Sequence, residues 1–200
     1  VPGANATVSQ LQLEHLEVLL TARDTLAVQL EIPLTVVREA VALAKGKGAR
    51  VLLDPAPAPE MLPADLIAVD IFVPNRHEAE QVLGRSIAGV EQAREAARQL
   101  HARGARIAVV KLGAEGAVWA DAGGAHLQPA LQVHAIDTTG AGDAFAGACA
   151  ALLDRGMPAA AAIELASRAA ALSTTRVGAQ PSLPWLVDVE ALARGDTEAN

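Results

Sequence analysis

One heptapeptide combines a turn that could bind an anion with a carboxylate that could accept a proton. The segment from Asp137 to Asp143, Asp-Thr-Thr-Gly-Ala-Gly-Asp, follows a short predicted strand and precedes an apolar helix that begins at Ala144. A glycine-rich turn at the start of a helix leaves backbone N–H groups unpaired at the positive end of the helix dipole. Such a turn can bind an anion. Asp143, in the first helical turn, could then take a proton from a hydroxyl group that attacks a phosphate.

The same heptapeptide also has a purely structural interpretation. An ordinary glycine-rich loop has this composition too, with Asp143 stabilising the positive end of the helix dipole. A lone Gly-x-Gly is weak evidence for a bound ligand. From composition alone, both interpretations stay open.

Alternating helices and strands must position these residues. Apolar residues recur either at helical spacing or in short runs, which is typical of parallel β/α units with helices on both faces of the sheet. The predicted strands cover 25–30, 50–54, 69–73 and 107–110, followed by a hairpin at 117–120 and 125–128 on the sheet edge. The predicted helices are 91–103, 141–154 and 158–174, with others that begin at Ser9 (in a capping box with Gln12), Pro33 and Asn75, and a last one over 186–192.

Composition limits the classes of function. The chain has 200 residues, 52% of them apolar, and a formal net charge of −7. This composition is wrong for disorder, and the length suits one domain over residues 1–200. An acidic chain with scattered basic residues lacks the electrostatic footprint of a nucleic-acid-binding protein. The longest apolar run, Ala144 to Leu153, is about half of the ~20 residues that a membrane span needs. We therefore expect neither nucleic acid nor membrane as a partner.

The chain ends and the cysteine count suggest a location. Cys149 is the single cysteine and therefore has no partner for an internal disulfide. The chain begins at Val1 without the pattern of a signal peptide. We expect a cytoplasmic protein.

Four motifs occur in the order and spacing of one enzyme family. They are Pro74 to Glu78, Leu112 to Gly116, Asp137 to Phe145 and Gly178 to Ser182. Through them the chain resembles the ribokinase (phosphofructokinase-B) family of carbohydrate kinases over essentially all 200 residues. The segments Pro2 to Asn5 and Gln29 to Glu31 favour the ribose-phosphorylating branch. The resemblance implies a three-layer α/β/α fold with a mostly parallel sheet, and ATP-dependent phosphorylation of D-ribose to D-ribose 5-phosphate.

The resemblance also implies roles for individual residues. Asp143 would be the general base, and the N–H groups of Gly140, Ala141 and Gly142 would stabilise charge on the transferred phosphoryl group. Glu31 and Asp143 would contact the sugar. The nucleotide would be bound by Asn75, Lys111, Leu112, Gly113, Ala114, Glu115, Gly116, Gly142 and Ser167. Mg²⁺ would be held at Glu78 through water, and the activating K⁺ at Asp137, Thr139, Ser173, Arg176, Gly178 and Ser182.

Several of these roles compete with simpler interpretations. Asn75 and Glu78 have the spacing of a capping box. Lys111 stands where a small hydroxyl residue is expected, so it either pairs with a phosphate or is a solvated strand end. Ser167 could be ordinary packing in an alanine-rich helix. Glu31 could be a solvated loop residue, although the carboxyl end of a parallel strand is where ligands bind.

Other functions remain alternatives. Relative to the family, a first segment with a glycine pair, a sugar-binding aspartate and a β lid that mediates dimerisation is missing before Val1. The chain could therefore be the nucleotide-binding part of a homodimeric kinase and lack activity alone. Fructose, a nucleoside or an acid sugar could replace ribose as substrate. A dinucleotide-dependent dehydrogenase is excluded, because its Gly-x-Gly-x-x-Gly should follow the first strand of a βαβ unit.

Overall fold

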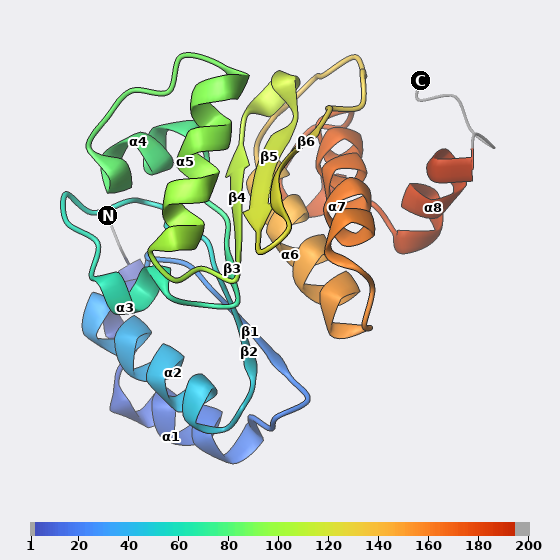
Figure 1. Cartoon of the computed structure of the whole chain (residues 1–200). Helices are drawn as coiled ribbons and strands as arrows, with labels where there is room; N and C mark the ends of the chain where they lie inside the picture. Colours follow the sequence, from blue (N-terminus) through green and yellow to red (C-terminus); the bar gives the residue numbers. More distant parts are fainter. Residues whose placement is uncertain (1–2, 195–200) are drawn as a thin grey trace. The chain divides into compact units, whose positions relative to one another are not determined.

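The computed structural model describes residues 3–194 and contains one sheet of six strands (Figure 1). The strand order is β1-β2-β3-β4-β5-β6. β1 (Thr25–Val28), β2 (Arg50–Leu53), β3 (Ile71–Phe72) and β4 (Ile107–Lys111) pair in parallel, in a register that aligns Leu52 with Ile71 and Ile71 with Ile107. β5 (Ala117–Asp121) and β6 (Gly124–Gln128) complete the sheet at one edge. Both the parallel arrangement and the hairpin at the edge agree with the prediction.

The chain separates into two compact units. The first runs to Val110 and includes Trp119–His126, and the second comprises Lys111–Val118 and the residues from Leu127 onward. The single domain over residues 1–200 stays a prediction. In the described part of the chain, no helix has both the length and the apolar character to cross a membrane.

The first unit packs helices against the parallel strands. Its helices are η1 (Gly3–Thr7), α1 (Gln10–Leu19), α2 (Leu34–Gly46), α3 (Ala64–Ile67), α4 (Arg76–Leu83) and α5 (Val90–Ala102). Ala93, Ala96, Ala97 and Leu100 share one face of α5 and are fully buried, as the spacing i, i+3, i+4 and i+7 requires. Gln12 Oε1 accepts a hydrogen bond from Ser9 N–H at 2.8 Å, which is the arm of the predicted capping box that fixes the start of α1.

The second unit is built on two long helices that lie side by side. They are α6 (Ala141–Asp154) and α7 (Ala159–Ser173), and α8 (Leu186–Arg194) packs on α7 (Figure 1). The short helices η2 (Gly113–Glu115) and η3 (Gln180–Ser182) lie in its loops. Both helices bury small side chains, among them Ala146, Cys149 and Ala166. Burial raises the pKa of the Cys149 thiol to about 12, as expected for a cysteine that serves as a small hydrophobic residue.

The largest departure from the predicted elements is in β3. The strand predicted over 69–73 is reduced to Ile71–Phe72. Asp70 Oδ2 accepts a hydrogen bond from Val51 N–H at 2.9 Å, so a side chain takes a donor that a backbone carbonyl would take in a longer ladder. The apolar pattern extends beyond the strand because Val69 and Val73 are buried all the same.

Candidate active site

The glycine turn at the start of α6 has the geometry of an anion-binding turn. Gly140 has φ +78°, and a Cβ atom placed on it would lie 3.3 Å from Ala179 Cα, so both conformation and space require glycine there. Ala141 N–H donates to Thr138 O at 3.2 Å, inside the turn. The N–H groups of Gly140 and Gly142 have no hydrogen-bond acceptor among the described residues. The turn therefore presents two of the three predicted N–H donors, while that of Ala141 is already engaged.

Asp143 is an exposed residue in the first turn of α6. It lines a cavity of about 260 Å³ between α6, α7, α8 and the segment before α8. Arg155 is the other charged residue of this lining, and the remainder is apolar, as at Ala151, Leu165 and Val189. Sugar hydroxyl groups need polar partners when they leave water, and this lining supplies few. The solvent-accessible carboxylate, rather than the cavity, is the feature that could act on a hydroxyl group.

Lys111 ends β4 and reaches the glycine turn. A Cβ atom placed on Gly142 would lie 3.5 Å from Lys111 Nζ. Lys111 is half-buried, and its ammonium group lies beside the turn. Lys111 is not a freely solvated strand end, because it also takes part in an interaction within the chain. Its pairing with a phosphate stays a prediction.

The loop after Lys111 is closed by its own backbone. Leu112 N–H donates to Gly116 O at 2.8 Å, and Gly116 N–H donates to Gly113 O at 2.9 Å. Gly113 and Gly116 have φ +61° and +95°. A Cβ atom placed on Gly116 would contact Gln128 O, and it would lie 2.6 Å from the backbone nitrogen of Ala130. The predicted nucleotide loop is thus a compact turn with Gly113, Ala114 and Glu115 exposed.

Asp137 joins the segment before α6 to the loop after α7. Its Oδ1 accepts a hydrogen bond from Thr139 N–H at 2.9 Å, and its Oδ2 accepts one from Gly178 N–H at 2.8 Å. The hydrogen bond from Gly178 N–H, followed by those from Thr139, lowers the pKa of this carboxyl group to about 2. Asp137 is therefore charged at neutral pH and holds two of the predicted cation-site residues, Thr139 and Gly178, beside it.

The other predicted cation-site residues lie on the same two segments. Ser173 is fully buried and its hydroxyl donates to Ala170 O at 2.8 Å, and Ser182, 1% exposed, donates to Ala179 O at 2.7 Å. Arg176 is exposed. Across residues 3–194, no group of three or more His, Cys, Asp and Glu side chains has the arrangement of a metal site. A cation here would be held by Asp137 together with hydroxyl and backbone oxygens.

Ser167 has a side chain without a partner. It lies in the middle of α7, 9% exposed, and its Oγ makes no hydrogen bond to the described residues. A hydroxyl group that is buried without a partner costs free energy. This observation favours a polar ligand over plain packing.

In the first unit, Asn75 and Glu78 form the capping box that their spacing predicts. Asn75 Oδ1 accepts from Glu78 N–H at 2.9 Å, while the two oxygens of Glu78 accept from Asn75 N–H and Asn75 Nδ2, each at 2.7 Å. Glu78 is only 7% exposed. The box fixes the start of α4.

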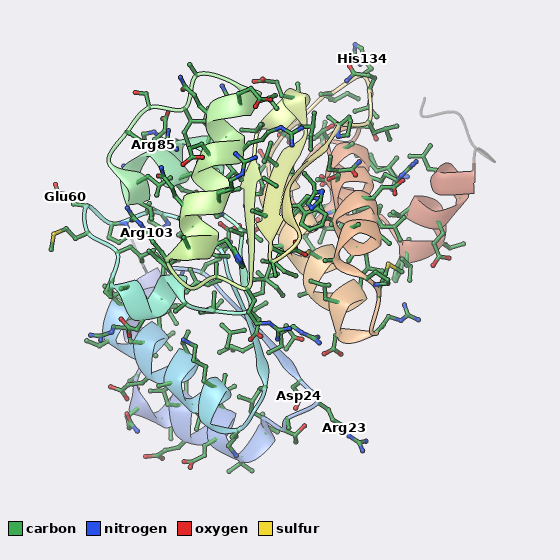
Figure 2. All side chains as sticks on the ribbon, in the orientation of Figure 1. Arg23, Asp24, Glu60, Arg85, Arg103 and His134 are labelled. Carbon is green, nitrogen blue, oxygen red and sulfur yellow. The ribbon has the colours of Figure 1, made fainter. Side chains whose placement is uncertain are left out.

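Two arginines of the first unit hold α4 on α5. Arg103 donates to Val82 O at 2.9 Å and Arg85 donates to Gln99 Oε1 at 3.3 Å, and both arginines are labelled beside α4 and α5 in Figure 2. The helix α4, which is capped by Asn75 and carries Glu78, is therefore held on α5 by side-chain hydrogen bonds.

Glu31 has a partner that the sequence did not reveal. Asn5 Nδ2 donates to Glu31 Oε2 at 3.2 Å, and both residues are exposed. Glu31 follows β1, at the carboxyl end of a parallel strand, as predicted. Asn5 was part of a motif used only for the resemblance, and Pro2 of that motif lies outside the described residues. Their separation by 26 residues left no local signal for the pair.

The predicted residues thus gather in groups within each unit. The second unit brings together the turn at Gly140–Asp143, Lys111, and the cluster around Asp137. The first unit holds the Asn75–Glu78 box and the Glu31–Asn5 pair. His134, on the connection between β6 and α6, is exposed (Figure 2).

The geometry of the second unit suits an enzyme that handles a phosphate group, because a carboxylate, an ammonium group and two N–H groups without an acceptor in the described part of the chain lie at one helix start. Comparison with known families agrees: the model of the pfkB family of carbohydrate kinases matches residues 1–186. The chain belongs to the pfkB family of carbohydrate kinases.

Individual relatives show similarity over most of this chain and part of theirs. Ribokinase of Haemophilus influenzae is 37% identical over 182 residues, which is 91% of this chain and 60% of the relative. Deoxyribokinase of Salmonella typhi is 35% identical over 185 residues, 92% of this chain and 60% of the relative. The chain spans about 60% of the length of these curated relatives.

A solved structure shows the same fold. Arabidopsis thaliana ribokinase complexed with ribose and ATP matches with a TM-score of 0.84 and 29% identity, over 96% of this chain and 63% of that one. The predicted fold class, a three-layer α/β/α fold with a mostly parallel sheet, is confirmed by this neighbour and by the strand pairing.

Proposed function

We propose that the protein is an ATP-dependent sugar kinase that phosphorylates D-ribose at O5 to give D-ribose 5-phosphate. The observation that carries the proposal is the start of α6, where the exposed Asp143 carboxylate and two N–H groups that have no acceptor among residues 3–194 lie within one turn. Phosphoryl transfer depends on positioning and charge stabilisation more than on covalent chemistry, and this turn supplies both.

Each group has a defined part in the reaction. The Asp143 carboxylate takes the proton of the sugar hydroxyl as its oxygen bonds to the γ-phosphorus, and the bond from that phosphorus to the β-phosphate oxygen breaks to release ADP. The N–H groups of Gly140 and Gly142 stabilise charge on the transferred group. Glu31 contacts the sugar.

The nucleotide is assigned to the loop 111–116, with Asn75, Gly142 and Ser167. Gly113 and Gly116 let the backbone of this loop come close to a ligand. The unpartnered hydroxyl of Ser167 supports the assignment, and the Arabidopsis relative is a complex with ATP and ribose.

Two metal ions complete the proposal, and the donor chemistry fits both. The oxygens of Glu78 each accept one hydrogen bond from Asn75, which leaves lone pairs for a water molecule bound to Mg²⁺. Asp137 offers a charged carboxylate for K⁺, and the Ser173 and Ser182 hydroxyls, which donate to carbonyls, keep lone pairs as well. When bound, these ions would neutralise phosphate charge and order the turn.

The test replaces the proposed base in the complete protein. We expect Asp143→Asn to lower kcat for ATP-dependent ribose phosphorylation by about 10²- to 10⁴-fold, the usual contribution of general base catalysis. Asp154→Asn, at the opposite end of α6, is the matched control and should keep most activity. Near wild-type turnover of Asp143→Asn would contradict the assignment.

The similarity to a deoxyribokinase gives a reason to test other sugars. An assay of ribose, 2-deoxyribose, fructose, a nucleoside and an acid sugar should show the highest kcat/KM for ribose. A clear preference for another of these compounds would support kinase activity but contradict ribose as the substrate.

The second candidate is a nucleotide-binding part without kinase activity of its own, favoured by the 60% coverage of the relatives. Calorimetric titration of the 200-residue chain separates the two. Binding of Mg–ATP without binding of ribose supports this candidate, and binding of both supports the kinase. A homodimer for the full-length protein and a cytoplasmic location stay predictions.

A further inference from the structure

A hydrogen bond from Asn5 orients the carboxylate of Glu31, one of the two predicted sugar contacts. Asn5 Nδ2 donates to Glu31 Oε2 at 3.2 Å, and the two residues are 26 positions apart in the first unit. Within residues 3–194, the Glu31 side chain has no other hydrogen-bond or ion-pair partner. The direction of this carboxylate therefore depends on Asn5.

Both residues of the pair lie on backbone that is itself held by hydrogen bonds. Asn5 belongs to η1, and its carbonyl oxygen accepts from Val8 N–H at 3.4 Å. Leu30, the residue before Glu31, donates its N–H to Ala56 O at 3.0 Å, in the loop after β2. The contact between the two side chains therefore joins two restrained segments, which is what a residue that positions another one requires.

The pair adds little to the stability of the fold. Both side chains are exposed. In water, a hydrogen bond between side chains replaces hydrogen bonds to solvent, and holding a glutamate in one rotamer costs conformational entropy. What the pair changes is the direction of the carboxylate. Glu31 Oε2 is engaged by Asn5, while Glu31 Oε1 keeps its lone pairs for a ligand.

The carboxylate lies at the edge of the sheet where a ligand is expected. Glu31 follows β1, and β1, β2 and β3 run parallel, so their carboxyl ends share one edge in the first unit. Ligands bind at that edge in parallel sheets. Asn75 and Glu78, the predicted nucleotide and metal residues, follow β3 at the same edge. A sugar hydroxyl group at this edge can donate a hydrogen bond to Glu31 Oε1.

We propose that Asn5 is a positioning residue that fixes Glu31 for sugar binding. The inference rests on the proposed function and deepens it, because the sequence motifs assign Glu31 to the sugar and assign no role to Asn5. Asn5 donates to one oxygen of the carboxylate, and the other oxygen accepts a hydrogen bond from the sugar. Asn5 contacts none of the reacting atoms, so it should affect sugar binding and leave the phosphoryl transfer step unchanged.

A double-mutant cycle on Asn5 and Glu31 in the complete protein tests the inference. It measures Kd for D-ribose by calorimetric titration, and kcat and KM for ATP-dependent phosphorylation. We expect Asn5→Ala to raise Kd and KM for ribose about three- to tenfold with kcat within about twofold of wild type, and Glu31→Ala to raise them about 10- to 100-fold. In the Glu31→Ala background, Asn5→Ala should have no further effect, because it acts through Glu31.

Two more substitutions separate hydrogen-bond donation from side-chain shape. Asn5→Asp is nearly isosteric but replaces the donor with a carboxylate that repels Glu31, so it should raise Kd for ribose more than Asn5→Ala does. Asn5→Gln keeps the donor and should stay closer to wild type than Asn5→Ala. A purely structural role would instead place Asn5→Asp nearest to wild type. Gln10→Ala, which removes an exposed carboxamide at the start of α1, is the control and should keep Kd for ribose within about twofold.

The outcomes distinguish this inference from the proposed function. Additive effects of Asn5→Ala and Glu31→Ala, or no effect of Asn5→Ala, would overturn the role of Asn5 and leave the kinase proposal intact. An unchanged Kd in Glu31→Ala would overturn it as well, because Asn5 would then position a residue that does not bind the sugar. Binding of ribose with the expected pattern but without phosphorylation would contradict the proposed function and support the role of Asn5. No binding of ribose by the wild-type protein would contradict both.

Discussion

The charged side chain of Asp137 holds two backbone segments of the candidate site together. Its carboxylate accepts backbone hydrogen bonds from Thr139 and Gly178, and the pKa of the group falls to about 2. A carboxyl group whose pKa is lower in the folded state than in the unfolded state stabilises the fold above its unfolded pKa. This contribution is complete above the ordinary value of 3.8 and is lost as the pH falls through that value toward about 2.

We therefore predict that Asp137→Asn removes part of the acid sensitivity of the protein. The free energy of unfolding, measured by urea denaturation between pH 6 and pH 2, should fall less steeply below about pH 4 in the variant than in wild type. Glu14→Gln, on an exposed residue of α1, is the control and should keep the wild-type slope. Parallel curves for Asp137→Asn and wild type would contradict the prediction.

At the level of residues, the sequence predicts local arrangements and misses distant ones. The Asn75–Glu78 box is readable because its members are three residues apart, and Asp143 because the turn precedes an apolar helix. The bonds from Asp137 to Gly178 and from Asn5 to Glu31 span 41 and 26 residues, and no local pattern encodes them. Likewise, only the structure shows that the N–H of Ala141 is used inside the turn.

The loop between β4 and β5 contains two glycines with different constraints. Both have positive φ, but a Cβ atom on Gly113 would meet nothing within 4 Å, whereas one on Gly116 would collide with the backbone of residues 128–130. We predict that Gly113→Ala costs about 1 kcal/mol, from the left-handed conformation alone, and that Gly116→Ala costs about 2 kcal/mol more because the backbone must move.

Urea denaturation of the two variants measures this difference, and each serves as the control of the other. Gly116→Ala should also weaken Mg–ATP binding more than Gly113→Ala, since it displaces the loop assigned to the nucleotide. Equal stabilities would show that the segment around Gln128 shifts without cost.

At the level of elements, apolar periodicity predicted the long helices. It did not predict the ends of β3, where a side chain forms a hydrogen bond in place of the backbone. The helix predicted over 141–154 has those bounds, and that predicted over 158–174 covers Ala159–Ser173. β3 is shorter than its apolar run because Asp70 bonds to Val51 N–H. The helix α3, four residues long, has too little periodicity to be predicted.

The whole chain is acidic, with a net charge of −7, and its proposed ligand is a polyanion. The net charge provides no long-range attraction for ATP, so we expect binding to rely on the proposed local groups, which are backbone N–H groups, Lys111 and Mg²⁺. We predict that Mg–ATP at about 100 times its Kd raises the free energy of unfolding by about 2.7 kcal/mol. ATP with EDTA should give a much smaller increase, because Mg²⁺ neutralises part of the phosphate charge.

Thermal unfolding followed by circular dichroism measures this shift. Mg²⁺ without nucleotide is the control and should leave the midpoint unchanged. A shift of the same size with ATP in EDTA would show that the site does not need the metal.

For the whole molecule, ordered motifs predicted the family, and the match over residues 1–186 confirms it. The sugar is less predictable, because relatives at 37% and 35% identity are a ribokinase and a deoxyribokinase. Glu31 and Asp143 are the predicted sugar contacts in this chain. Ribose and deoxyribose differ by one hydroxyl group, and the residues that would contact that group are not part of the motifs.

The bond from Gly178 N–H to Asp137 also has a consequence for the order of folding. It closes a segment of 41 residues that contains all of α6 and α7. Closing such a segment is entropically cheaper once the two helices have paired, because the intervening chain is then already compact. The glycine turn at the start of α6 should therefore acquire its final geometry late, and the Gly178 amide should exchange its hydrogen sooner than the amides in the middle of α6 and α7.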